Sequence, residues 1–89
     1  MQREGGSWLL DGLLPIDELQ DKPGLTGIGE AAQGLYHTVG GFVASNMGKI
    51  PKRAEKFRYG EWEFEVVDMD LNRIEEVLAT RAATQKSNF

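Results

Sequence analysis

The residues best suited to binding a ligand form a short acidic run, with Asp68, Asp70 and Asn72 at alternate positions. This spacing matches the D-x-D-x-N start of a calcium loop, in which oxygen donors hold the cation. The complete loop also needs glycine at its sixth position and glutamate at its twelfth, where this chain has Arg73 and Ala79. We therefore expect no complete calcium loop, and a weak Mg²⁺ or Ca²⁺ contact is one interpretation. A hairpin turn rich in Asp and Asn is the other, and it needs no ligand.

A second pattern is the pair Gly40 and Gly41, which follows a histidine and a threonine as in a phosphate-cradling loop. The surrounding residues favour a helix instead, because apolar side chains recur at i, i+3 and i+4. Thr38 is a suitable N-cap, Gly48 suits the left-handed position after the helix, and Pro51 prevents continuation. The predicted buried face consists of Val39, Phe42, Val43, Asn46, Met47 and Ile50.

The cost of the glycine pair needs an explanation of its own. Glycine inside a helix costs about 1 kcal/mol relative to alanine. Two adjacent glycines therefore predict close approach of this helix to a neighbouring element, where a Cβ atom would clash. On this interpretation Gly41→Leu destabilises the domain.

The residues that an enzyme would use do not form a recognisable set. His37 is the only histidine, Ser45 falls on the predicted polar side of the helix, and cysteine is absent. No spacing suggests a Ser-His-Asp arrangement. Gly27 and Gly29 match part of a dinucleotide-binding fingerprint, but Ala32 replaces its last glycine and no strand precedes it. We expect that the chain is not an enzyme.

A strongly acidic strand is predicted in the C-terminal third. Glu61, Glu63 and Glu65 alternate with three large apolar residues, which gives one acidic face and one apolar face. A solvated face with cross-strand ion pairs is one interpretation, and an ion-sensing or partner-docking surface is the other. The basic residues available on adjacent predicted strands are Lys56, Arg58, Arg73 and Arg81.

Length and composition indicate one small domain. The chain has 89 residues, of which 40% are hydrophobic, and a net charge of −4. Negative charge disfavours nucleic acid as a partner, because such binding depends on basic side chains that neutralise phosphates. No apolar run approaches the roughly 20 residues that span a bilayer, so we expect no membrane insertion of this segment. The start of the chain lacks the apolar stretch of a signal peptide.

The periodicity predicts an α+β fold in the order β-α-α-β-β-β, a two-layer domain with two helices on one face of a mainly antiparallel sheet. In the last strand, Ile74, Val77 and Ala79 all face inward only if a bulge lies near Glu75 and Glu76. Residues 1–5 are expected to be a linker edge, residues 6–81 the domain, and residues 82–89 a polar, frayed tail. The predicted elements are a strand at 7–14, a helix from Pro15 to about 22, a loop at 25–35, the capped helix, strands at 56–59 and 61–66, a turn at 68–72 and a strand at 73–81.

Three segments together resemble the CorC/HlyC transporter-associated domain, over nearly the whole of residues 6–81. They are GSWLLDGLLPIDEL, YHTVGGFVASNMGKIP and FRYGEWEFEVVDMDLNRI. The helix that begins T-x-G-G-F and ends G-x-I-P is the most specific element of the resemblance. Leu71 departs from it, since a small, turn-favouring residue, often glycine, is expected at the last hairpin.

The resemblance implies the C-terminal part of a longer bacterial protein, hemolysin-like or linked to magnesium and cobalt efflux. Such proteins carry a pair of CBS domains, frequently preceded by a transmembrane domain, and these would be the partners of this domain. It would then be a cytoplasmic, non-catalytic accessory domain at the inner membrane that regulates ion transport through interdomain contacts. Its fold would be similar to a subdomain of FAD-binding enzymes of the PCMH type. The alternative function is a ligand-binding module for FAD, an adenine nucleotide or a divalent cation, and a homodimer is an alternative assembly.

Overall fold

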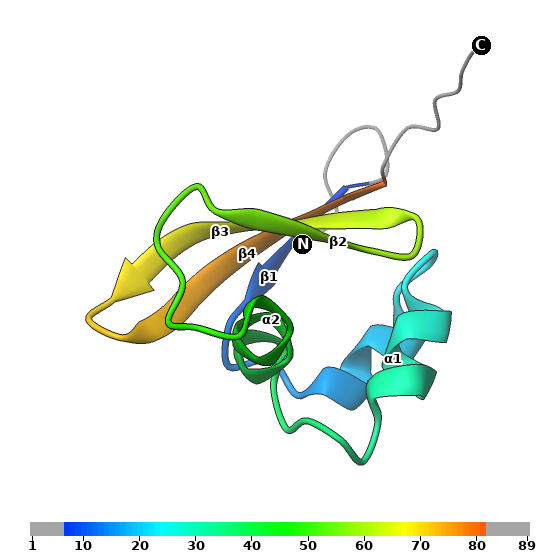
Figure 1. The fold of residues 1–89 in the computed structure, drawn as a ribbon. Helices are drawn as coiled ribbons and strands as arrows, with labels where there is room; N and C mark the ends of the chain where they lie inside the picture. Colours follow the sequence, from blue (N-terminus) through cyan, green and yellow to red (C-terminus); the bar gives the residue numbers. More distant parts are fainter. Residues whose placement is uncertain (1–6, 82–89) are drawn as a thin grey trace, which may run out of the picture.

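The computed structural model describes residues 7–81. The expectations for residues 1–5 and 82–89 fall outside the described residues. Along the chain, the elements are β1 (Trp8–Asp11), the 3-10 helix η2 (Ile16–Asp21), α1 (Thr26–Ala32), α2 (Val39–Met47), β2 (Lys56–Tyr59), β3 (Trp62–Asp70) and β4 (Arg73–Arg81), as Figure 1 shows.

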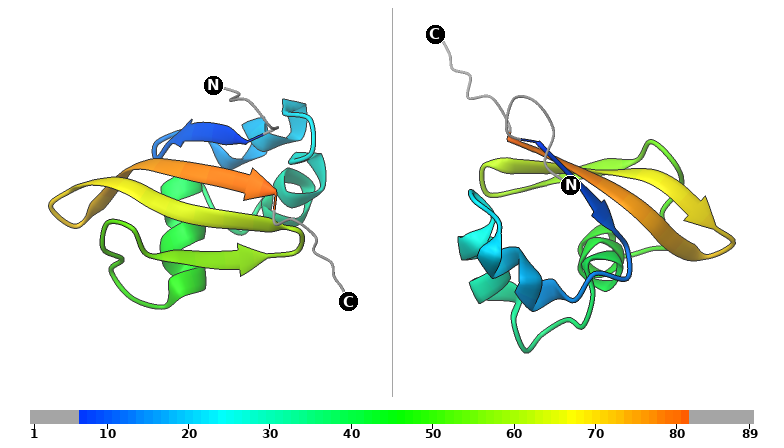
Figure 2. Two further views of the ribbon diagram at one scale, coloured as in Figure 1. Left: turned by 90° about the horizontal axis from the view of Figure 1, so that it is seen from above. Right: turned by 180° about the vertical axis from the view of Figure 1, so that it is seen from behind.

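The four strands form one antiparallel sheet in the order β1-β4-β3-β2. All three helical elements lie on the same side of this sheet (Figures 1 and 2), and no described element covers the opposite side. The predicted two-layer α+β fold is therefore confirmed. β1 pairs with β4, the last strand of the chain, so that Trp8 lies opposite Ala79.

The core lies between the sheet and the helices, with Phe42 of α2 at its centre. The Phe42 ring lies 5.1–6.0 Å from the rings of Phe57, Tyr59 and Phe64, centroid to centroid, and 5.5 Å from that of Tyr36. Such aromatic pairs contribute about 0.5–1.5 kcal/mol each beyond the area they bury. No polar or charged residue is buried among those described. The alternation predicted for β3 is confirmed, since Trp62, Phe64 and Val66 are all buried.

The predicted bulge is also present, between β3 and β4. Val66 lies opposite Val77, but Asp68 lies opposite Glu76 and Met69 opposite Ile74. In the register of the described strands, Val67 and Glu75 thus have no residue opposite them. The irregularity changes the phase of both strands, and Ile74 and Val77 are consequently both buried although they are three residues apart.

The short helix predicted after Pro15 is present, as the 3-10 helix η2. Two other predictions in the N-terminal half were wrong. Residues 25–35 contain helix α1 and not only a loop, and β1 ends at Asp11. The close approach of η2 explains the glycine in the middle of α1. A Cβ on Gly29 would lie 2.7 Å from the main-chain nitrogen of Gln20 in η2. Glycine lets α1 and η2 pack in close contact. It also lowers the helix propensity of the segment, which is why a loop was predicted at residues 25–35.

Helix α2 begins and ends as predicted. The Thr38 side-chain oxygen accepts a hydrogen bond from the Gly41 N–H at 3.1 Å, and Gly48 is left-handed with φ +72°. The prediction for the buried face was wrong at two positions. Ile50 is 58% exposed, and Asn46 is exposed, with its side chain donating a hydrogen bond to the Phe42 carbonyl at 2.8 Å.

The close approach of α2 to the sheet occurs at Gly40. Its N–H donates to the Gly12 carbonyl at 2.8 Å, and a Cβ on Gly40 would lie 3.0 Å from the same oxygen. A Cβ on Gly41 would meet only the Thr38 hydroxyl oxygen, at 3.4 Å. The close packing predicted for the glycine pair is therefore confirmed for Gly40 and wrong for Gly41, so the reason for expecting Gly41→Leu to destabilise the domain does not hold.

We expect Gly12→Ala and Gly41→Ala to have opposite effects on the free energy of unfolding. A Cβ on Gly12 would lie 2.0 Å from the Ile74 carbonyl oxygen, so the main chain would have to shift, at a cost of at least about 2 kcal/mol. Alanine at the exposed Gly41 gains helix propensity and should stabilise by about 0.5–1 kcal/mol. Urea unfolding of the two variants measures both values. Equal effects would contradict this description of the helix–sheet contact.

The β3–β4 turn gives a second prediction. Leu71 has φ +57°, a left-handed conformation that costs a leucine about 1–2 kcal/mol, and its side chain is 91% exposed. Leu71→Gly removes this strain and loses no buried apolar surface. Glycine also raises the entropy of the unfolded chain, which offsets part of the gain, so the net stabilisation should be about 0.5–1 kcal/mol. Leu71→Ala, the matched control, keeps the strain and should leave the melting temperature almost unchanged. A stabilisation by both variants alike would show that strain is not the cause.

Candidate functional site

The acidic run lies at the end of β3 next to the β3–β4 turn. Asp68 and Asp70 alternate with Met69, which packs against the core, so both carboxylates face away from the helices. One Asp68 oxygen accepts a hydrogen bond from the Met69 N–H at 3.0 Å and lies 4.0 Å from Arg53 Nε. An Asp70 oxygen accepts one from Arg73 Nη2 at 3.3 Å.

The third predicted ligand is not brought to the same side. Asn72 lines a groove of about 280 Å³ against α2, together with Gly40 and Ala44. The described residues contain no group of three or more His, Cys, Asp or Glu side chains that could hold a metal ion. Asp68 and Asp70 offer the hard oxygen donors that Mg²⁺ and Ca²⁺ prefer, and water would have to supply most of the remaining positions.

The phosphate-loop interpretation of the glycine pair does not hold, because the N-terminal N–H groups of α2 are already occupied. The Val39 N–H donates to the Leu14 carbonyl at 2.9 Å, and the Gly40 N–H donates to the Gly12 carbonyl. The Gly41 N–H donates to the Thr38 hydroxyl. Anion binding at a helix N-terminus needs these donors to be free.

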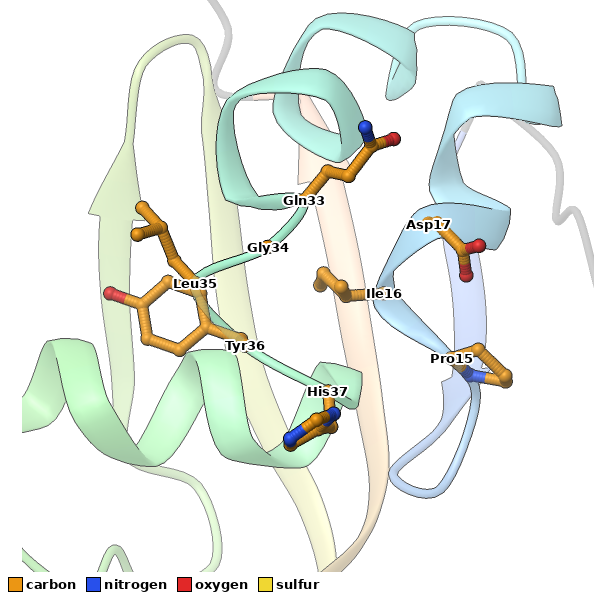
Figure 3. Close-up of a pocket in the computed structure, with 8 residues that line it drawn as sticks. All are labelled: Pro15, Ile16, Asp17, Gln33, Gly34, Leu35, Tyr36 and His37. Atoms are coloured by element: carbon orange, nitrogen blue, oxygen red, sulfur yellow. The ribbon is translucent and has the colours of Figure 1, made fainter.

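His37 lines a cavity of about 380 Å³ between η2 and the segment that joins α1 to α2. Figure 3 shows Asp17 on η2 at one side of this cavity and Tyr36 and His37 on the connecting segment. The His37 carbonyl accepts a hydrogen bond from the Ile16 N–H at 2.9 Å, while the imidazole is exposed. His37 precedes α2, whereas Ser45 lies six residues after Val39, the first residue of α2, or about 9 Å further along the helix axis, so these two residues do not form a nucleophile–base pair.

Two of the three glutamates predicted for the acidic face form ion pairs with basic residues of neighbouring strands. A Glu63 oxygen lies 3.9 Å from Lys56 Nζ, and a Glu61 oxygen accepts a hydrogen bond from Arg81 Nη1 at 3.2 Å. These side chains are exposed, and each such pair contributes little, typically about 0–1 kcal/mol. No helix within residues 7–81 is long and apolar enough to cross a membrane.

The fold thus defines a small α+β module that carries its polar groups on the surface. Comparison with known sequences identifies the family of this module. The chain belongs to the CorC_HlyC family of transporter-associated domains, whose model matches residues 1–83.

Full-length relatives are much longer than this chain. It is 42% identical over 87 residues to the polyamine export protein of Salmonella typhimurium, with 97% of this chain and 19% of the relative aligned. It is 45% identical to the UPF0053 protein sll0260 of Synechocystis, again over 87 residues, with 98% of this chain and 19% of the relative aligned. The chain therefore spans about a fifth of the length of these relatives.

Solved structures of the same family have the same fold. A CorC_HlyC domain of a Xylella fastidiosa hemolysin, in complex with Mg²⁺ and Mn²⁺, is 41% identical with a TM-score of 0.71, and the match covers 91% of this chain and 94% of that one. The CorC_HlyC domain from Nitrosomonas europaea is 27% identical with a TM-score of 0.76, covering 91% and 93%. Since both matches cover nearly the whole of the solved chains, domains of this size form folded structures by themselves.

Proposed function

We propose that this domain is a non-catalytic accessory module of a longer membrane-transport protein, in which it regulates transport through contacts with a CBS pair and a transmembrane domain. The observation that carries the proposal is the match to relatives named polyamine export protein. Almost all of this chain aligns with less than a fifth of the length of each of these relatives. The family, a transporter-associated domain, supports the non-catalytic role. The module would lie on the cytoplasmic side of the membrane.

The sheet face that no described helix covers is the surface we propose for these contacts. Leu78 lies on this face, because Val77 and Ala79 on either side of it are buried in the core, and it is only half-buried. Half-buried Val67 lies in the adjacent bulge. An apolar centre within a charged rim is typical of surfaces that dock against another domain.

The regulatory mechanism would be a shift of conformational populations. A docked domain changes the equilibrium of a transporter only to the extent that it contacts one conformation better than another. The names of the relatives suggest a cationic cargo. Several are called polyamine export protein, and a domain from Neisseria meningitidis, 29% identical, is described as the associated region of a putative Mg²⁺ and Co²⁺ transporter. We propose that the transported substrate is a small organic or inorganic cation.

A divalent cation bound at Asp68, Asp70 and Asn72 is the second candidate function. It is favoured by the Mg²⁺ and Mn²⁺ complex of the Xylella domain and by the two adjacent exposed carboxylates. Arg73 competes for Asp70, and Asn72 would have to turn from its groove, so the affinity would be low. For FAD or an adenine nucleotide, the occupied N-terminus of α2 removes the phosphate-binding motif that the glycine pair offered.

The accessory role can be tested in the longer protein. Deletion of residues 6–81 should change the export of polyamines from cells loaded with putrescine or spermidine, and unchanged export and regulation would refute the role. Val67→Lys with Leu78→Lys should reproduce the effect of the deletion, because two buried charges would weaken docking by at least about tenfold, or 1.4 kcal/mol. Leu35→Lys is the matched control, since Leu35 is 72% exposed in the segment between α1 and α2. If deletion alters export but the sheet-face variants do not, the proposed docking face is wrong.

Calorimetry of the domain with Mg²⁺ and Mn²⁺ tests the second candidate. We expect weak binding that is lost in the Asp68→Asn, Asp70→Asn double variant. It should strengthen in Arg73→Gln, since that change removes the competing guanidinium. Glu61→Gln, which removes a carboxylate outside the run, is the control. Absence of binding by the wild-type domain at millimolar metal, or binding that survives the double substitution, would exclude the site.

A further inference from the structure

β2 is a free edge of the sheet with a defined set of outward-facing main-chain groups. It pairs only with β3, through a hairpin whose two-residue turn is Gly60 and Glu61. In such a hairpin the flanking residues exchange main-chain hydrogen bonds, and every second residue before them does so too. Tyr59 and Phe57 therefore bond to β3, and the N–H and C=O groups of Lys56 and Arg58 point to the open edge. No described element pairs with that edge.

The same segment concentrates positive charge. Residues 49–59 contain five of the ten basic residues of the chain and a single acid, Glu55, although the whole chain has a net charge of −4. Within the described part, Lys52 and Arg58 take part in no salt bridge. Basic residues in the loop and along the edge form the basic edge segment, which consists of Lys49, Lys52, Arg53, Lys56 and Arg58.

The loop that enters β2 is held in place by local contacts. Glu55 accepts a hydrogen bond from Lys49 Nζ at 2.7 Å and another from the Lys52 N–H at 2.9 Å. These two contacts lower the pKa of the Glu55 carboxyl below its usual value. Ala54 and Glu55 also form a bulge against Val66, with Ala54 at φ +74°. The basic side chains therefore project from an ordered loop.

A groove of about 340 Å³ runs beside this edge, between the C-terminal end of α2 and β2. Met47 and Phe57 supply its apolar part, and its polar lining consists of Asn46, Lys49, Glu55 and Lys56. An edge strand beside a helix-lined groove is the geometry by which some domains bind an extended peptide as an additional strand. Main-chain hydrogen bonds then give affinity, and alternate side chains enter the groove.

We propose that the edge of β2 binds an extended acidic segment of another polypeptide as a fifth strand. Alternate side chains of that segment would lie on the uncovered sheet face beside Lys56 and Arg58, and should be acidic. The intervening side chains would face the groove beside Met47, and should be apolar. A second copy of this chain is a poor occupant, because antiparallel pairing of two β2 edges would place Lys56 and Arg58 against the same residues of the other copy.

The test uses the domain labelled with ¹⁵N and the synthetic peptide Ac-Glu-Val-Glu-Phe-Glu-Val-Glu-NH₂. We expect saturable binding with a Kd below about 1 mM. The amides of Lys56 and Arg58 should become protected from hydrogen exchange, since they would donate to the peptide. The same peptide N-methylated at every residue, which has no main-chain donor and is blocked along both edges, should not protect them. Arg58→Glu should weaken binding at least tenfold, whereas the matched variant Arg73→Glu, at the far hairpin, should not.

Four outcomes would overturn the proposal. The first is no saturable binding of the peptide at about 1 mM. The second is binding that is insensitive to Arg58→Glu or leaves the Lys56 and Arg58 amides unprotected. The third is concentration-dependent dimerisation of the domain through this edge, measured by sedimentation, which would make a second copy the occupant. Binding of a DNA duplex to the basic edge segment without binding of the peptide also counts against an acidic strand.

Discussion

Main-chain hydrogen bonds join the helix layer to the sheet at Gly12, and the packing of the described residues depends on that junction. The Gly12 N–H donates to the Glu75 carbonyl in the bulge of β4, and the Gly12 carbonyl accepts from the Gly40 N–H at the start of α2. Three segments distant in sequence thus meet without an intervening side chain. The short separation between α2 and the sheet at this junction fixes how far Phe42 reaches into the core. It therefore fixes where the aromatic cluster forms.

The bulge between β3 and β4, which contains Glu75, also determines which charged side chains lie on the same face of the sheet. Because the phase of both strands changes there, Met69 turns inward and the two aspartates turn outward. The acidic end of β3 then lies on the uncovered sheet face with the cross-strand ion pairs. The basic edge segment lies at β2, the edge of the same sheet. The domain therefore has an acidic region and a basic region at different parts of the same sheet, although its composition is only moderately acidic.

Local signals predicted those elements whose structure is decided locally. Helix α2 carries its own cap and stop, and β3 alternates strictly, so both were predictable from the sequence. Helix α1 was missed because Gly27 and Gly29 lower helix propensity, and the compensation for Gly29 is a packing contact with Gln20 of the preceding element η2, which helix propensity does not reveal. Sequence periodicity likewise could not decide between Gly40 and Gly41, since only the position of the Gly12 carbonyl distinguishes them. The spacing of Asp68, Asp70 and Asn72 suggested one site, but the turn places the asparagine beside α2.

The pairing of β1 with β4 has a mechanical consequence. Trp8 at the start of β1 lies opposite Ala79 near the end of β4, so residues 7 and 81 leave the described fold at the same end of an antiparallel pair. A pulling force applied between these two points would load the hydrogen bonds one after another, as in opening a zipper. It would not load them together in shear, so the sheet would offer little resistance to such a force. If neighbouring segments transmit tension to these points, β1 should peel away before the β2–β3 hairpin is disturbed.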